Sequence, residues 1–229
     1  MNEIYLSCGV NSSWANKNDL FKLDREMNFW KELETRGQVP PLRRGAAFVF
    51  DKRNGLVYTF GGFDAKIRFD LLHVLDLRSC FSYFIILRQI FLTSKETLVW
   101  KELPNKGNRV GGRSYSSLVL YGQKLIIFGG RLNESQLGKD MYCYDLEKLE
   151  WTMVDTSGEV PKERYAHSTS HPPNSRYFYI YGGLGSRREF GDVWRFDLEG
   201  FPFPVLFSFG HLTFFPAKKR KKMATHHRI

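Results

Sequence analysis

The sequence predicts an all-β protein built from repeated sheets, and three recurring landmarks support this prediction. Apolar, strand-like runs end in a pair of glycines: Gly61-Gly62, Gly129-Gly130 and Gly182-Gly183. A tryptophan closes three of the copies: Trp30, Trp100 and Trp151. Trp100 and Trp151 are 51 residues apart, and a constant period near 50 residues indicates a repeat architecture.

Each copy is expected to hold its strands in a fixed order. The first strand begins at an arginine: Arg44, Arg113 and Arg164. The second strand (LVYTF, KLIIF or YFYIY) ends at the glycine pair, where a Cβ would obstruct a turn and close packing. The third strand ends in aspartate, and the fourth carries the tryptophan. We expect this large ring to be buried between adjacent sheets, because one sheet cannot bury both of its faces alone.

In this order and at this spacing, the landmarks resemble the kelch repeat over roughly residues 4 to 199. The resemblance implies a kelch-type β-propeller, whose blades are four-stranded antiparallel sheets arranged radially. It predicts two complete blades flanked by two three-stranded ones, because the first strand is missing from the first copy and the fourth from the last. Kelch propellers usually have six or seven blades, so the chain is expected to be a fragment or an aberrant gene model.

The second copy carries an insertion near residues 80–97. Asp145 lies six residues before its tryptophan, whereas Asp76 to Trp100 spans 24 residues. The additional sequence, around Cys80 to Lys95, is strongly apolar but is interrupted by Arg88, and it is shorter than the roughly 20 residues that a bilayer span needs. We interpret it as a loop between the third and fourth strands. It is either an amphipathic or membrane-touching loop, or intronic sequence translated in frame.

Residues 1–199 are therefore assigned to propeller blades, and residues 200–229 to a disordered basic tail outside them. The tail has six Lys and Arg residues and no acid, so only about +4 of the net charge of +10 belongs to the repeats. Nucleic-acid binding is not expected, because that function needs positive charge clustered on a folded face. The run Lys218 to Lys222 leaves a nuclear-import address or a polyanion contact as the alternative to an accidental, solvated end.

The three cysteines, Cys8, Cys80 and Cys143, are odd in number and have no motif spacing, which favours a reducing compartment. The first 19 residues read as propeller sequence rather than as a signal peptide. We therefore expect a cytoplasmic or nuclear protein with no membrane association.

The resemblance implies that one face of the propeller is lined by the segments that link blades and by the loops after the glycine pairs. Arginines on this face can pair bidentately with the carboxylates of an acidic peptide. The binding-face candidates are Arg44, Asp64, Arg68, Arg113, Arg131, Asn133, Arg164, Arg187 and Arg188. For the repeat arginines, at positions 44, 113 and 164, the alternative is a structural role bracing neighbouring blades. The loop arginines favour recognition, because loops on rigid scaffolds carry variable contacts.

The predicted function is a protein–protein interaction module or scaffold, such as a substrate receptor or adaptor. Its expected partner is a protein or an acidic peptide, and no cofactor is expected. The incomplete blades at either end also predict self-association, because unpaired sheet edges and uncovered faces invite it.

The alternative function is a metal-dependent enzyme, either a copper oxidase or an iron protein similar to plant specifier proteins. The copper site of kelch-like oxidases needs a Tyr–Cys cross-link, but Cys80 lies in the insertion and Cys143 lies on a strand. The four-residue spacing of the iron site is matched by Glu159, Glu163 and His167, although these span a loop and a strand start. The sequence contains no phosphate loop, zinc-ligand cluster or nucleophile elbow. We therefore predict a protein without catalytic activity and without a bound metal.

Overall fold

A computed structural model of the chain describes residues 5–10, 13, 15–77, 98–156 and 159–198. These residues form strands β1 to β16 in four separate sheets. The all-β prediction is therefore confirmed for the described part of the chain. No helix in these ranges is long and apolar enough to cross a membrane.

The two outer sheets have three strands each. The first contains β1 (Tyr5–Val10), β2 (Asn16–Asp24) and β3 (Phe29–Glu32). The last contains β14 (Ser168–Ser170), β15 (Tyr177–Tyr181) and β16 (Val193–Asp197). Every neighbouring pair of strands in both sheets is antiparallel.

The two middle sheets each hold the four antiparallel strands of a complete blade. The second sheet contains β5 (Ala47–Asp51), β6 (Leu56–Phe60), β7 (Leu72–Asp76) and β8 (Leu98–Glu102). The third contains β10 (Ser117–Tyr121), β11 (Lys124–Phe128), β12 (Met141–Asp145) and β13 (Glu150–Met153). The sequence had not indicated a short fifth strand, which runs parallel to the outermost strand of each: β4 (Thr35–Gly37) beside β8, and β9 (Lys106–Gly107) beside β13.

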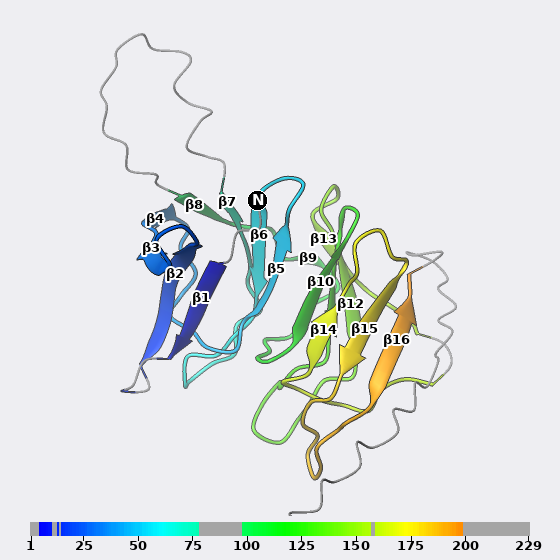
Figure 1. Ribbon diagram of the computed structural model, residues 1–229. Helices are drawn as coiled ribbons and strands as arrows, with labels where there is room; N and C mark the ends of the chain where they lie inside the picture. Colours follow the sequence, from blue (N-terminus) through cyan, green and yellow to red (C-terminus); the bar gives the residue numbers. More distant parts are fainter. Residues whose placement is uncertain (1–4, 11–12, 14, 78–97, 157–158, 199–229) are drawn as a thin grey trace, which may run out of the picture.

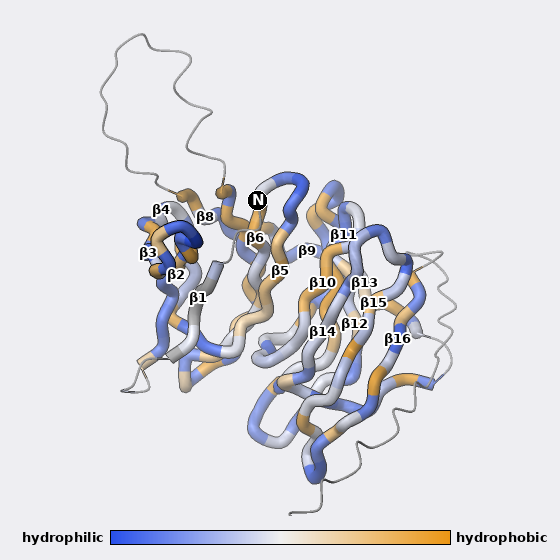
Figure 2. Tube along the Cα trace, viewed as in Figure 1, coloured by the Kyte–Doolittle hydropathy of each residue, from blue (hydrophilic) through white to orange (hydrophobic). Residues whose placement is uncertain are grey.

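The four sheets stand side by side in chain order, as an arc of blades (Figure 1). The first strands of successive blades, β5, β10 and β14, are neighbours on the inner side of this arc. Hydrophobic residues follow the strands, and hydrophilic residues gather in the turns and loops between them (Figure 2). This arrangement is a partial β-propeller.

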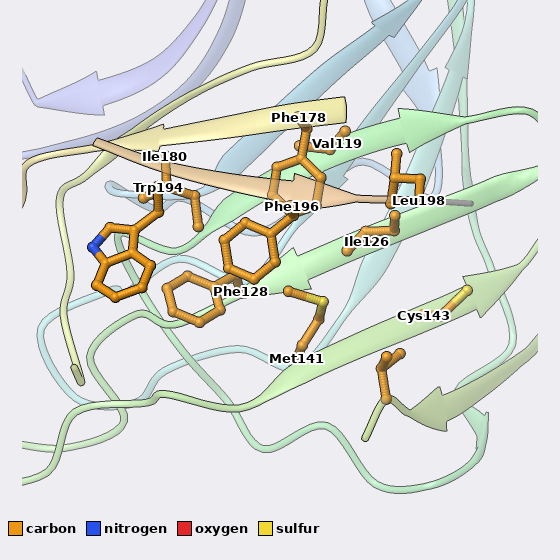
Figure 3. Close-up of a cluster of buried hydrophobic side chains, with 11 residues drawn as sticks. Val119, Ile126, Phe128, Met141, Cys143, Phe178, Ile180, Trp194, Phe196 and Leu198 are labelled. Atoms are coloured by element: carbon orange, nitrogen blue, oxygen red, sulfur yellow. The ribbon is translucent and has the colours of Figure 1, made fainter. Parts of the chain in front are cut away.

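Apolar side chains are buried between sheets, and the alternation along each strand decides which neighbour they contact. On β11, Leu125 and Ile127 pack toward the second sheet, whereas Ile126 and Phe128 pack toward the fourth. Because both faces of this strand are covered, its sequence KLIIF reads as a continuous apolar run. Figure 3 shows the cluster between the third and fourth sheets, where Phe128 and Met141 meet Phe196.

The tryptophan prediction is confirmed at two of three positions. Trp100 and Trp151 are 2% and 1% exposed, and the Trp151 ring lies edge-on to Phe60 of the preceding sheet, with centroids 5.3 Å apart. Trp30 is 45% exposed, so the expectation that it is largely buried was wrong. It pairs with Leu23, on the face of the first sheet opposite Leu20, and only the Leu20 face packs against the second sheet.

The strands that flank the predicted insertion occupy the predicted positions. Asp145 pairs with Glu150 across the hairpin of the third sheet, whereas Asp76 pairs with Val99 in the second. The strand pairing thus resumes beyond the additional sequence, between the third and fourth strands of that blade. The inserted segment itself, residues 78–97, and the basic tail from residue 199 lie outside the described residues.

Candidate functional site

One end of the blades, here called the loop face, carries the loops after the glycine pairs together with the segments that enter each blade. The post-glycine loops are residues 63–71, 131–140 and 184–192, and they gather at the lower edge of Figure 1. The entering segments are residues 43–46, 113–116 and 164–167. Isolated antiparallel bridges join loop and segment in each blade: Arg44 with Phe63, Ser114 with Arg131, and Tyr165 with Leu184. The predicted loop arrangement is therefore present.

The glycine pairs make this arrangement possible. Gly61 has a φ of +71°, and a Cβ there would clash with the carbonyl oxygen of Arg113 in the next blade. The amide of Gly62 instead donates a hydrogen bond of 2.8 Å to that same oxygen. Gly130 makes the equivalent bond to the carbonyl oxygen of Arg164 at 2.9 Å, so the first two glycine pairs each close a strand and also tie their blade to the next one.

Arg113 and Arg164 are buried structural residues, which corrects their assignment to the binding face. Arg164 is 0% exposed and donates to the carbonyl of Gly182 at 2.8 Å and to both oxygens of Asp192 at 2.6 and 2.9 Å. Arg113 makes the same contacts with Gly129 and Asp140. Both guanidinium groups are buried and hydrogen-bonded within their own blades, so neither is available to bind a ligand.

The equivalent arginine of the second blade is Arg43 rather than Arg44. Arg43 is 0% exposed and donates to the carbonyl of Gly61 at 2.8 Å and to the Thr59 hydroxyl at 3.1 Å. The sequence Arg43-Arg44 offered two choices, and the expectation that the first strand begins at Arg44 was off by one residue. Arg44 is instead partly exposed on the loop face, with its guanidinium carbon 5.1 Å from the centre of the Phe63 ring.

The structure brings two of the predicted loop arginines together on one carboxylate. Arg68, in the second blade, and Arg131, in the third, each donate from Nη2 to Glu134, and both N···O distances are 2.7 Å. The Arg68 guanidinium also lies over the Phe63 ring at 4.6 Å, and that of Arg131 lies over Tyr165 at 5.7 Å. These contacts link three consecutive blades across the loop face.

Arg187 and Arg188 occupy the corresponding loop of the last blade. Both are exposed, and the guanidinium carbon of Arg188 lies 4.8 Å from the centre of the Phe190 ring. In the part of the chain that the structure describes, no carboxylate forms an ion pair with either residue. These two positive charges face solvent.

Asp64 and Asn133 shape their loops. The Asp64 carboxylate accepts hydrogen bonds of 2.9 Å from the amides of Lys66 and Ile67, and these backbone bonds lower its pKa. The Asn133 side-chain oxygen accepts from the amide of Ser135 at 3.0 Å. Both side chains therefore hold turns that position the neighbouring arginines.

A model described as the KLHDC2/KLHL20/DRC7 Kelch-repeats domain matches residues 1–210. The chain belongs to the Kelch-repeat family. The match covers all four blades of this Kelch domain, and it confirms the resemblance that the repeat landmarks indicated.

Curated proteins similar to this Kelch domain come from fungi, animals and plants. Tip elongation aberrant protein 1 of Schizosaccharomyces pombe is 28% identical over 197 residues, which are 84% of this chain and 16% of that protein. Kelch domain-containing protein 3 of Rattus norvegicus is 26% identical over 209 residues, 86% of this chain and 49% of that protein. Acyl-CoA-binding domain-containing protein 4 of Arabidopsis thaliana is 25% identical over 217 residues, 75% of this chain and 32% of that protein. The chain thus spans half or less of the length of these relatives.

The Kelch domain does not assemble the residues of the alternative iron site. His167 is 8% exposed, and its Nε2 lies 3.0 Å from the Ser117 hydroxyl of the preceding blade, whereas Glu159 and Glu163 are exposed. Burial, and then the nearby charge of Arg164, lower the pKa of His167 to about 4. No three His, Cys, Asp or Glu side chains of the described ranges are grouped so that they could hold a metal ion.

Sequence reasoning missed the two tyrosines of the loop face. Tyr115 and Tyr165 occupy adjacent entering segments, and their ring centroids are 6.1 Å apart. Backbone hydrogen bonds run from the Tyr115 amide to Gly45 and from the Ala166 amide to Tyr115. Their positions in the sequence could have revealed them. Tyr165 directly follows the landmark Arg164, and Tyr115 lies two residues after Arg113.

Proposed function

We propose that this Kelch domain is a protein-interaction module whose loop face binds acidic segments of a partner protein. Kelch domains generally bind protein partners, which supports the broader part of this proposal. The observation that carries the acidic preference is the set of arginines held on aromatic rings around the loop face. The proposed role requires no chemistry by the domain itself.

The arginines favour carboxylates for two reasons. A guanidinium group presents donors in a fixed, planar fork that matches two carboxylate oxygens. Stacking on an aromatic ring reduces the motion of the guanidinium group, so less entropy is lost when a ligand binds. Arg188 on Phe190 and Arg44 on Phe63 meet both conditions on the loop face.

Within a longer protein, such a module would act as a substrate receptor or adaptor that presents its bound partner to other domains. The similarity to relatives of which this chain covers only 16% and 49% supports this proposal. The post-glycine loops differ in sequence between blades, and we expect these differences to select the partner.

The test is the affinity of the purified domain for an acidic peptide, measured by fluorescence anisotropy at two salt concentrations. Arg187→Glu/Arg188→Glu is expected to weaken binding at least about tenfold, because two attractions become repulsions. Binding by the unchanged domain should also weaken with salt, because exposed charges are screened. The matched control is Lys52→Glu/Lys148→Glu, which makes the same charge change at exposed positions in turns at the opposite end of the blades.

The proposal fails if the domain binds acidic and neutral peptides equally, or if the control pair weakens binding as much as the loop pair. Circular dichroism of all variants separates lost binding from lost folding. Equal weakening by both pairs would mean that total charge, rather than the loop face, attracts the peptide.

We also propose self-association through the two ends of the arc. Trp30 is 45% exposed on the first sheet, and Tyr181 is 57% exposed on the last. Their counterparts within the arc, Trp151 and Phe60, are buried against each other at 5.3 Å. A head-to-tail contact between copies would therefore repeat an interface that the domain already uses between its own blades.

A further inference from the structure

Glu134 occupies the space between two arginines that come from different blades. Its Oε1 lies 2.7 Å from Nη2 of Arg68, and its Oε2 lies 2.7 Å from Nη2 of Arg131. The glutamate side chain is 75% exposed, whereas the Arg68 side chain is only 10% exposed. A solvent-exposed carboxylate thus binds two cations that are themselves less exposed, since the Arg131 side chain is 30% exposed.

The two guanidinium groups are held in place by contacts that do not involve the Glu134 carboxylate. Arg68 lies over Phe63 at 4.6 Å. Arg131 lies over Tyr165 at 5.7 Å, and it donates to the backbone carbonyls of Asn133 and Glu134 at 3.2 and 3.1 Å. If the carboxylate moved away, both Nη2 groups would still be directed toward the position that it had filled.

Glu134 uses only part of the donor set of Arg68. Nε of Arg68 is buried and has no hydrogen-bond partner in the described part of the chain. Arginine carries five N–H donors, and Arg68 donates one of them, from Nη2, to Glu134. Because Nε is buried, an incoming carboxylate would take the position of Glu134 rather than a separate one.

We propose that Arg68 and Arg131 form a carboxylate-binding subsite, and that Glu134 fills it as an internal competitor until an acidic side chain of the partner displaces it. This inference rests on the proposed function of the loop face. The ligand is the side-chain carboxylate of an aspartate or glutamate within an acidic segment.

The exchange is energetically accessible. An ion pair with an exposed partner contributes little net stability in water, and the Glu134 carboxylate, at 75% exposure, is well solvated when it is apart from the arginines. Replacing one exposed carboxylate by another therefore has a small cost, which the remaining contacts of a longer ligand can offset. The hydrogen bond from Arg68, followed by the charge of Arg131, lowers the pKa of Glu134, so this residue is ionised at neutral pH and competes there.

With the competitor present, the apparent affinity equals the intrinsic affinity multiplied by the fraction of domains in which the subsite is open. Glu134→Gln removes the competing charge while it keeps the length of the side chain. For an exposed ion pair, this change is expected to tighten binding of an acidic peptide about two- to fivefold. Glu189→Gln is the matched control, because it removes the same charge from an exposed position in the corresponding loop of the next blade.

The probe is a hexaglutamate peptide with an acetylated N-terminus and an amidated C-terminus, so that only side-chain carboxylates are available. Its dissociation constant is measured by fluorescence anisotropy for the unchanged domain and for both variants. The expected result is a larger gain for Glu134→Gln than for Glu189→Gln, and the loss of that gain when Arg68→Gln is added. Equal gains in the two glutamate variants, or a gain that survives Arg68→Gln, would overturn the inference.

This design separates failure of the inference from failure of the proposed function. If Arg187→Glu/Arg188→Glu weakens hexaglutamate binding but Glu134→Gln does not strengthen it, the loop face binds acidic peptides and Glu134 is only a link between blades. If no variant binds hexaglutamate and the unchanged domain does not either, both ideas are wrong. Thermal unfolding of each variant shows whether the domain remains folded.

Discussion

At the scale of single residues, burial divides side chains of the same type into structural and exposed groups. Arg43, Arg113 and Arg164 are almost completely buried and donate to the carbonyls of the glycine pairs, whereas Arg187 and Arg188 are exposed. A buried guanidinium group needs several acceptors, because an unpaired charge is very costly away from water. The repeat supplies the glycine carbonyl at the same place in each of these three blades. Arg113 and Arg164 also bind an aspartate, whereas Arg43 binds the Thr59 hydroxyl.

The tryptophans allow a direct test of this division. Trp151→Ala is expected to lower the free energy of unfolding by about 3–5 kcal/mol, because it leaves a large cavity between two sheets. Trp30→Ala should cost no more than about 1.5 kcal/mol, since 45% of this side chain is already exposed. Urea unfolding monitored by circular dichroism measures both values. Equal losses would show that Trp30 is covered in solution.

Two buried histidines predict a dependence of stability on pH. Burial, followed by the charges of Arg43 and Arg164 respectively, lowers the pKa values of His73 and His167 to about 4. The unfolded chain binds these protons near pH 6.5, so stability is complete above that value and is lost as pH falls toward 4. The urea midpoint should therefore decrease between pH 6.5 and 4, above the range in which most carboxylates titrate.

The variant that checks this origin is His167→Gln, which cannot gain a proton. Its urea midpoint should fall less steeply over the same pH interval, even if the variant is less stable at neutral pH. An unchanged slope would assign the pH dependence to other groups.

At the scale of elements, the end of the second strand decides how one blade joins the next. Gly129 has a φ of +64°, and an added Cβ would lie 2.7 Å from the carbonyl oxygen of Arg164 in the following blade. The neighbouring Gly130 amide donates to that oxygen at 2.9 Å, so the two backbones cannot move apart without breaking a buried bond. Glycine is required here by the backbone angle and by the available space together.

Gly122 provides a control that separates these two requirements. It has a φ of +57°, in the hairpin turn of the same blade, and no atom lies within 4 Å of an added Cβ. Gly122→Ala should lower the free energy of unfolding by about 1 kcal/mol, the cost of the backbone angle alone. Gly129→Ala should cost roughly 1–3 kcal/mol more, because the Cβ also forces the blades apart. Similar urea midpoints for both variants would contradict this account.

At the scale of the whole molecule, the described residues of the domain do not form a single central core. Its apolar residues form three clusters, each between two neighbouring sheets. Each blade is therefore stabilised mainly by the blades beside it, as in other repeat proteins. The first and last sheets each have one face that no other sheet covers within the described arc (Figure 1).

These two uncovered faces predict self-association that depends on protein concentration. Trp30→Glu and Tyr181→Glu should each increase the fraction of monomer in sedimentation velocity runs, because each places a charge on one side of the head-to-tail contact. Val160→Glu is the control, since Val160 is similarly exposed, at 42%, in a segment between sheets. A domain that stays monomeric at every concentration, or a control with the same effect, would contradict the proposed contact.

The sequence alone determined the repeat, the order of the strands and the function of the glycine pairs. These features depend on residues that are close together in the chain, such as the run KLIIF before Gly129 and Gly130. Strand alternation and backbone angles act over a few residues, so they can be predicted from a printed sequence. The family resemblance extended the same local pattern to a propeller.

Only the tertiary structure decided which members of equivalent sets are buried and which side chains meet on the loop face. Trp30 and Trp151 share a repeat position, but only Trp151 lies against a preceding sheet. Arg68 and Glu134 are 66 residues apart in the chain, and no local pattern indicates that they form an ion pair. The physical reason is that burial and ion pairing depend on what the neighbouring blade presents, and the packing between sheets sets that contact.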